Sequence, residues 1–423
     1  MPINLSDVFF TEQDDIVPQS GQYNQIFNTY IANALAGNDS IAGSIYDDDP
    51  YYDPNNYSGF INWGELNTDG GNDIITGSVG YARHSSRPSG YNIINFGTLN
   101  TGEGNDRIDG SHRNGGYFPS YTGIENSGTL NAGEGDDTIT AYGSGFEGFA
   151  NYGTLNTEDG NDIITAISES NYTQGYSGIG FFNGEGSTLH TGEGNDTIIG
   201  SSDNSSFSGI VNWSGSTINT GNGEDSILSQ GIFSNGGYVL LGQDNDSITF
   251  TNFYERAVWN NSFIGTGDGD DRITSNGFIY NQGIIDTGDG DDSIIVDHGG
   301  FDNITGTTYG IYNNGGAINT GNGNDSIIVN DGFESAPNSS GSVFLGEGED
   351  YIKGFGSGDF YGGNGNDILE LTPGTYTVGI WDTSTIFTKD NQLLITSEFE
   401  QLIAGGTTYN FTSLTAGQII IVS

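Results

Sequence analysis

The residues best suited to chemistry in this sequence are aspartates that follow glycine-rich turns. Residues 99–108 read L-N-T-G-E-G-N-D-R-I, and the pattern of two spaced glycines, then Asn or Asp, then Asp recurs along the chain. Glycine permits positive φ and close backbone approach, so carbonyl oxygens of the turn can converge on one point. The aspartate adds a carboxylate. Oxygen ligands of this kind suit a hard cation, so the pattern predicts a turn that binds Ca²⁺.

The turn occurs in thirteen copies, aligned on their last aspartate: Asp39, Asp73, Asp106, Asp137, Asp162, Asp196, Asp225, Asp246, Asp271, Asp292, Asp325, Asp350 and Asp367. The predicted metal-binding residues are these aspartates from Asp73 onward and the glycines of nine turns: Gly102 and Gly104, Gly133 and Gly135, Gly192 and Gly194, Gly221 and Gly223, Gly267 and Gly269, Gly288 and Gly290, Gly321 and Gly323, Gly346 and Gly348, and Gly363 and Gly365. The steps between copies vary from 17 residues (Asp350 to Asp367) to 34 (Asp39 to Asp73). Such repeats are typical of a solenoid whose coils carry loops of different length.

The turn resembles the G-G-x-G-x-D-x-U-x nonapeptide of RTX (hemolysin-type) calcium-binding proteins. The best copies are residues 361–369 (Y-G-G-N-G-N-D-I-L) and 266–273 (T-G-D-G-D-D-R-I), and the resemblance covers roughly residues 37–370. It implies Ca²⁺ as the cofactor and a secreted β-solenoid, and the longer repeat also resembles those of cyanobacterial exoproteins. RTX nonapeptides usually follow one another in tandem, whereas each copy here is followed by a different segment. We therefore predict one calcium turn per coil of a parallel β-helix, not a two-sided β-roll.

A second motif, G-I-x-N-x-G-x-L, lies just before the turn. It occurs as residues 59–66 (G-F-I-N-W-G-E-L), with further copies around Asn126, Asn151, Asn212 and Asn313. An Asn at one place in every coil can stack into a hydrogen-bonded ladder, as amide side chains do in stacked sheets. The alternative is an Asn that only forms a turn. The isoleucine two residues beyond each aspartate is predicted to point inward, in one apolar column: Ile248, Ile273 and Ile294 are examples.

The composition supports an all-β fold. The 423 residues include 71 Gly, 24 Phe and 23 Tyr but 8 Pro and no Cys, and no 3.6-residue apolar stripe persists. We predict an N-terminal cap over residues 1–36, the calcium-binding solenoid over 37–370 and a C-terminal β cap over 371–423. Caps are expected because an open coil end exposes unpaired strand edges. The RTX resemblance implies that a type I export signal overlaps the C-terminal cap.

The net charge restricts the function further. Eight Lys and Arg against 55 Asp and Glu give −47, which excludes nucleic acid and anionic membranes as primary partners. Stacked aspartates would repel one another without cations, and one Ca²⁺ in each of about twelve gaps would return about +24. Calcium is therefore expected to be a requirement of the fold. Other copies of the chain or a surface polysaccharide are further candidate partners.

The N-terminal residues predict an extracellular or cell-surface protein exported without a Sec signal peptide. Residues 1–36 contain neither a basic segment nor a long apolar run, so no Sec signal and no membrane span are expected. Weak calcium sites need the millimolar Ca²⁺ that is found outside the cell.

No catalytic residue is predicted. The four histidines, His84, His112, His190 and His298, share no repeat position. Arg83, Arg87 and Arg113 lie with His84 and His112 in two successive inserts and leave open a polysaccharide-acting enzyme (lyase, epimerase or hydrolase). Our leading interpretation is a secreted calcium-binding structural or cell-surface protein. An RTX-type adhesin for glycan or ice is a further alternative, although uneven coil lengths count against a flat ice-matching face.

Overall fold

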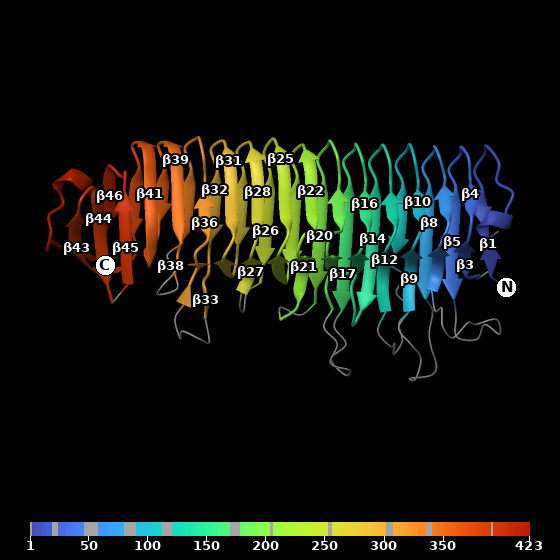
Figure 1. Ribbon diagram of the computed structural model, residues 1–423, viewed down its shortest axis with the longest axis horizontal. Helices are drawn as coiled ribbons and strands as arrows, with labels where there is room; N and C mark the ends of the chain where they lie inside the picture. Colours follow the sequence, from blue (N-terminus) through green and yellow to red (C-terminus); the bar gives the residue numbers. More distant parts are fainter. Residues whose placement is uncertain are drawn as a thin grey trace. The chain divides into compact units, whose positions relative to one another are not determined.

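The computed structural model describes residues 2–18, 24–45, 58–79, 90–111, 121–169, 178–203, 206–252, 256–301, 308–335, 341–390 and 392–423. Apart from two short 3₁₀ helices, η1 (Leu5–Asp7) and η2 (Phe411–Ser413), the elements of this part are strands (Figure 1). They form two compact units, Met1–Gly231 and Ile232–Ser423. In each unit the chain returns at every coil to three parallel sheets. The predicted parallel β-helix is therefore confirmed.

The first unit contains seven or eight short strands in each sheet. Its first sheet consists of β1 (Ile3–Asn4), β3 (Ile26–Asn28), β6 (Ser58–Asn62), β9 (Gly90–Asn95), β12 (Tyr121–Asn126), β15 (Phe149–Asn151), β18 (Phe181–Asn183) and β21 (Ser208–Asn212). Its second sheet consists of β4 (Ile31–Asn33), β7 (Glu65–Asn67), β10 (Thr98–Asn100), β13 (Thr129–Asn131), β16 (Thr154–Asn156), β19 (Thr188–His190) and β22 (Thr217–Asn222). Its third sheet consists of β2 (Ile16–Val17), β5 (Ser40–Ile45), β8 (Ile74–Val79), β11 (Arg107–Gly110), β14 (Thr138–Ser144), β17 (Ile163–Glu169), β20 (Thr197–Ser202) and β23 (Ser226–Gln230).

The second unit repeats the arrangement. Its first sheet consists of β24 (Ile232–Asn235), β27 (Arg256–Asn260), β30 (Phe278–Asn281), β35 (Ile311–Asn313) and β38 (Phe333–Glu334). Its second sheet begins with β25 (Tyr238–Gln243), β28 (Phe263–Asp268), β31 (Ile284–Asp289), β36 (Ala317–Asn319), β39 (Ser342–Gly348) and β41 (Gly358–Gly365). Its third sheet consists of β26 (Ser247–Thr251), β29 (Arg272–Ser275), β32 (Ser293–Val296), β37 (Ser326–Val329), β40 (Tyr351–Lys353), β42 (Ile368–Leu371) and β46 (Gln401–Ala404). A separate small hairpin joins β33 (Gly300–Phe301) to β34 (Thr308–Tyr309).

Antiparallel pairing replaces the coils near the C-terminus. β45 (Gln392–Ser397) still runs parallel to β41, but β44 (Ser384–Lys389), β43 (Gly374–Trp381) and β48 (Ile419–Val422) follow it in antiparallel order. β47 (Thr407–Asn410) pairs antiparallel with β46. At the other end, β1 already pairs in parallel with β3 inside residues 1–36. The three predicted segment boundaries stay a prediction. Within the part described, no helix is long and apolar enough to cross a membrane.

The core consists of apolar columns that run from coil to coil. On the third sheet of the second unit, Ile248 lies next to Ile273, and Ile273 next to Ile294, all at most 1% exposed. The predicted inward isoleucine column is therefore confirmed. Each such side chain contributes about 1.5–3 kcal/mol through burial. Because the strands pair in register, one position of the repeat decides the chemistry of a whole column.

The asparagine of the second motif forms the amide ladder that was one of the two alternatives. Within each unit the side-chain Nδ2 of one Asn donates to Oδ1 of the next, at 2.7–3.0 Å. The second N–H donates to a backbone carbonyl of the following coil, as Asn151 does to Thr188 at 2.9 Å. The ladder contains Asn28, Asn62, Asn95, Asn126, Asn151, Asn183 and Asn212 in the first unit, and Asn235, Asn260, Asn281 and Asn313 in the second.

We predict that Asn151→Ala lowers the free energy of unfolding by about 2 kcal/mol or more, because it removes one hydrogen bond each from Asn126 Nδ2, Asn183 Oδ1 and the Thr188 carbonyl. Denaturant unfolding followed by circular dichroism measures the change. Asn219→Ala, on the outer face of the second sheet, is the control and should cost little. Equal losses from both variants would contradict a special role of the ladder.

Candidate metal centre

The glycine-rich turns occupy one place in the coil. Each connects a strand of the second sheet to a strand of the third, as the turn of Asp106 connects β10 to β11 and that of Asp271 connects β28 to β29. Because these strands pair in register with those of the neighbouring coils, the turns of each unit stack in one column. The predicted arrangement of one turn per coil on one edge is therefore observed.

Glycine is favoured in the turn by both conformation and space. Gly104 has φ +135°, and a Cβ added there would lie 1.8 Å from the carbonyl oxygen of Gly71 in the preceding coil. Gly102 has φ +99°, and its Cβ would lie 1.5 Å from the carbonyl oxygen of Asp69. Four turns carry another residue at one of these two positions and keep a positive φ of 60–81° there: Leu35, Asp69, Glu158 and Asp244. The predicted glycines are thus explained by stacking of the turns, whether or not a metal is bound.

The aspartate that ends each turn is buried and binds the coil before it. One carboxylate oxygen, Oδ1, accepts a hydrogen bond from the backbone N–H of the preceding aspartate at 2.7–3.0 Å. The first unit carries this chain of bonds from Asp39 to Asp225, and the second from Asp246 to Asp367. Glu400 takes the same role after the last turn, since its Oε2 accepts from the N–H of Asp367 at 2.8 Å.

The residue before the aspartate binds in the opposite direction. The backbone N–H of Asn72 donates to Oδ1 of Asn38 at 2.7 Å, and that of Asn105 donates to Oδ1 of Asn72 at 3.0 Å. The same contact recurs at Asp270 and Asp291 in the second unit. The Asn-Asp pair of the motif therefore joins each coil to both neighbours. Sequence reasoning missed this role, although the recurrence of Asn or Asp at this place was a signal for it.

The second carboxylate oxygen of the buried aspartate, Oδ2, has no hydrogen-bond partner in most of the turns. Oδ2 is enclosed without a hydrogen-bond partner in eleven turns whose aspartates are at most 2% exposed: Asp39, Asp73, Asp106, Asp137, Asp162, Asp196, Asp271, Asp292, Asp325, Asp350 and Asp367. A buried carboxylate oxygen without a partner is costly, and here the cost is repeated at every coil. The column therefore needs a proton or a cation at this atom.

Burial raises the pKa of these carboxyl groups, since the charged form loses its hydration. The pKa rises to about 8 at Asp137, to about 7 at Asp162, Asp196, Asp292 and Asp325, and to about 6 at Asp39, Asp73 and Asp367. The backbone N–H bond of the preceding coil opposes the rise. In several turns a buried threonine five residues earlier also opposes it, as the Thr157 hydroxyl does at Asp162.

The turn interior offers oxygen atoms of three kinds: the aspartate Oδ2, the threonine hydroxyl and backbone carbonyls of the glycine segment. This set fits a hard cation such as Ca²⁺. Among the described residues, no three acidic, histidine or cysteine side chains gather at one point. A cation in the turn would therefore depend on hydroxyl and backbone oxygens as well as on carboxylates.

Of the remaining candidates for chemistry, the structure describes His190 and His298. Arg83, Arg87, Arg113, His84 and His112 lie outside the described residues. His190 belongs to an outer column of the second sheet, between Asn156 and Asn219, and its Nδ1 lies 3.3 Å from the carbonyl oxygen of Asn219. His298 is exposed, in a bend after β32.

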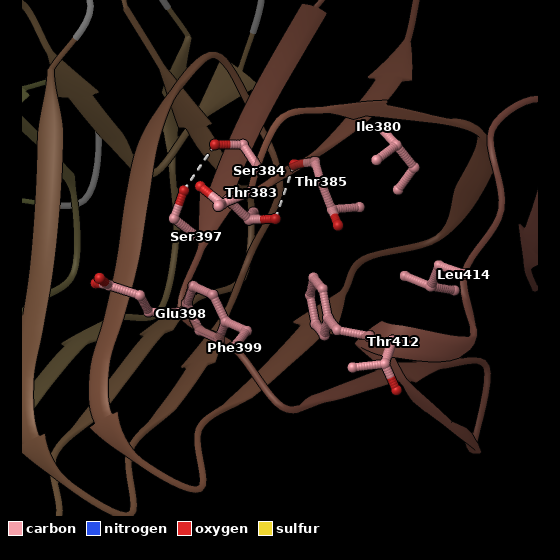
Figure 2. Close-up of a pocket in the computed structure, with 11 residues that line it drawn as sticks. Ile380, Thr383, Ser384, Thr385, Ser397, Glu398, Phe399, Thr412 and Leu414 are labelled. Atoms are coloured by element: carbon pink, nitrogen blue, oxygen red, sulfur yellow. Dashed lines mark hydrogen bonds between the residues drawn. The ribbon is translucent and has the colours of Figure 1, made fainter.

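A hollow of about 290 Å³ lies among the C-terminal strands (Figure 2). The hydroxyls of Ser384 and Ser397 hydrogen-bond to each other at 2.8 Å, and the Thr396 hydroxyl donates to the carbonyl of Thr385. Phe399 contributes an aromatic ring, and Figure 2 shows the Glu398 side chain directed away from the serine pair. No histidine or lysine lines this hollow. Glu398 is the acidic residue that lines it.

Fold and turns together define a parallel β-helix with one acidic turn per coil. No protein-family model and no curated protein matches the chain. Among solved structures, the chain is similar to a hyperactive, Ca²⁺-dependent, β-helical antifreeze protein from an Antarctic bacterium, with 16% identity over 96% of each chain and a TM-score of 0.32. At that identity and TM-score the similarity carries no argument about function.

We predict that the metal-free chain becomes more stable as the pH falls from 8 to 5. The turn carboxyls have folded pKa values of about 6 to 8, above the usual 3.8, so the folded chain holds protons that the unfolded chain has released. Their contribution is complete near pH 4 and is lost as the pH rises through these values. Thermal unfolding of chelator-dialysed protein across this range measures it. A midpoint that rises with pH would contradict the prediction.

Proposed function

We propose that this protein is a calcium-stabilised structural β-solenoid that acts outside the cell or at its surface. The observation that supports the proposal is the column of buried aspartate oxygens without hydrogen-bond partners, found in eleven turns. A net charge of −47 supports it further, because the folded chain then brings many carboxylates close together. The resemblance of the turn to RTX nonapeptides points to the same cation.

Calcium in the turns would be held by the aspartate Oδ2 and by hydroxyl and carbonyl oxygens of the same turn. The bound ion supplies positive charge to a column of buried carboxylates. The chain's own residues orient the site: the backbone N–H of the preceding coil fixes Oδ1, which leaves Oδ2 free to bind, and the glycines keep the turns close enough to stack. Binding of this kind joins neighbouring coils and stabilises the folded state alone.

The proposed location follows from the strength of such sites. Weak, oxygen-only sites fill at the millimolar Ca²⁺ found outside cells, and export without a Sec signal is what the RTX resemblance implies. Calcium binding and a structural role are the proposed function of the solenoid. We propose no catalytic role for His190, because it lies in an outer column of amide side chains and its Nδ1 contacts the carbonyl oxygen of Asn219.

We predict that calcium removal at pH 8 and low salt unfolds or expands the chain, and that Asp162→Asn shrinks the stabilisation that calcium restores. The amide keeps an oxygen that accepts the N–H of Asp137 but removes the charge. Calcium titration followed by circular dichroism and sedimentation measures both effects. At a hundredfold excess over Kd each site contributes about 2.7 kcal/mol.

Glu134→Gln is the matched control for this experiment. Glu134 is exposed in the turn of Asp137 and has the same charge, so its replacement changes the net charge equally without touching a buried carboxylate. If chelation changes neither the spectrum nor the sedimentation of the wild-type chain, the proposed function fails. If both variants respond alike, the buried aspartate is not the binding group.

A second candidate function is binding to ice, favoured by the outer face of the second sheet in the first unit. Thr98, Thr129, Thr154, Thr188 and Thr217 stack in register there, and the parallel column contains Asn100, Asn131, Asn156, His190 and Asn219. Strands lie about 4.8 Å apart, so hydroxyl, methyl and amide groups form a regular array that can order water. The uneven coil lengths do not extend to these strands, since β7, β10, β13, β16 and β19 all have three residues in register.

If this face binds ice, Thr154→Lys should abolish most of the thermal hysteresis of the calcium-loaded chain, because a long charged side chain would hold the ice surface off the array. Thr154 is exposed on β16. Thr197→Lys, on the third sheet, is the control and should leave the hysteresis intact. A wild-type chain without hysteresis would exclude ice binding and would leave the calcium proposal standing.

A further inference from the structure

An arginine in the second unit is held against aromatic rings. The guanidinium Cζ of Arg256 lies 4.3 Å from the ring centroid of Trp259, 5.0 Å from that of Tyr280 and 5.4 Å from that of Phe278. Its Nε is enclosed without a hydrogen-bond partner. In the part of the chain that the structure describes, no ion pair joins it to a carboxylate. In a chain with 55 acidic residues, this is unusual.

A β-bulge puts Arg256 on this face. Arg256 pairs with Phe278 and Val258 pairs with Ile279, so Ala257 is an extra residue in β27. In a regular strand, residues three apart point to opposite faces, and Arg256 would then face away from Trp259. Bulges re-aim side chains in this way and recur near functional sites. The arginine is therefore placed beside the aromatic column by a local irregularity, not by the repeat.

The aromatic column continues along the outer face of the first sheet. Trp259, Tyr280 and Tyr312 are in register, with ring centroids 5.5 Å and 5.3 Å apart. Amide groups lie at its rim, since the Trp259 Nε1 donates to Asn261 and Asn314 donates to the hydroxyl of Tyr280. Trp259 is 40% exposed and Arg256 is half-buried, so a ligand can reach both.

We propose that Arg256, Trp259 and Tyr280 form a binding site for an anionic sugar, namely a pyranose that carries a carboxylate or a sulfate ester. The guanidinium matches either anion with two parallel hydrogen bonds, and the three rings hold it in place so that little side-chain freedom is lost on binding. Aromatic rings offer an apolar surface to the C–H face of a sugar, and the amides of Asn261 and Asn314 can bind its hydroxyls. The site lies outside the calcium turns and goes beyond the proposed structural function.

Dense polyanions are a poor fit for the same place. The net charge of −47 opposes nucleic acid and anionic membranes, whose charges must be met by many basic residues. One arginine suffices for one charge on one sugar. In physiological salt the Debye length is about 8 Å, so distant carboxylates of the solenoid are screened while the direct contact with Arg256 is not.

The test is a titration of the full calcium-loaded chain, followed by isothermal calorimetry and tryptophan fluorescence. Three probes of equal length are compared: trigalacturonate, a sulfated trisaccharide and neutral maltotriose. We expect one or both acidic probes to bind and maltotriose to bind at least about tenfold more weakly. Which acidic probe binds better identifies the anion. Equal binding of maltotriose, or no binding of either acidic probe, would overturn the proposal.

Three variants locate the site. Arg256→Lys keeps the charge but loses the paired hydrogen bonds, so affinity for the acidic probe should fall about tenfold. Trp259→Ala should weaken binding of the same probe and remove its fluorescence change. Arg272→Lys, at an exposed arginine on the third sheet, should change nothing. Unfolding midpoints of all variants are measured alongside, and unchanged binding in a folded Arg256→Lys chain would refute the assignment.

Discussion

The structure depends on one constraint: parallel coils stack in register, so each residue lies on its counterpart in the next coil. For isoleucine this is favourable, because Ile248, Ile273 and Ile294 bury one another. For asparagine it is also favourable, because an amide has both a donor and an acceptor and the ladder can continue within each unit. For aspartate it is unfavourable, since carboxylates have acceptors alone. The same geometry that builds the core therefore creates the electrostatic problem of the turns.

The chain solves half of that problem with its own backbone. The N–H of Asp162 satisfies Oδ1 of Asp196, and the N–H of Asp137 satisfies Oδ1 of Asp162, which uses one oxygen of each carboxylate. The other oxygen has no backbone donor left, because the N–H groups of the residues before the aspartates, such as Asn161 and Asn195, are bound to the side chain of the preceding Asp or Asn. The unpaired oxygen is a consequence of the hydrogen bonds between successive aspartates, which use one oxygen of each carboxylate. It makes the stability of the fold depend on protons or cations from solution.

The sequence predicted which positions of the repeat stack, but not every contact that the stacked residues make. Positions that recur along the repeat, such as Asp106 and Ile108, imply their stacking once a solenoid is assumed. The hydrogen bonds that Asn72 and Asp73 make with neighbouring coils were missed because the motif was interpreted only as a set of metal ligands. The aromatic column could have been found by aligning the copies on Asn260 and Asn281, each of which follows an aromatic residue. The contact of Arg256 with that column could not, because it requires a bulge.

The coils differ in length mainly in the connections between the third sheet and the first, away from the turns and strands that stack in register. The strands before the turn keep matched lengths from β7 to β19, while the long differences in sequence length fall between the third sheet and the first, for example after Val79 and before Gly90. An insertion there leaves the turn column and the outer face of the second sheet in register. An insertion in the turn would instead break the hydrogen bonds between aspartates and misplace every glycine that faces a carbonyl oxygen. The uneven repeat spacing is therefore compatible with a regular column of turns, and selection can vary the loops without altering the coil.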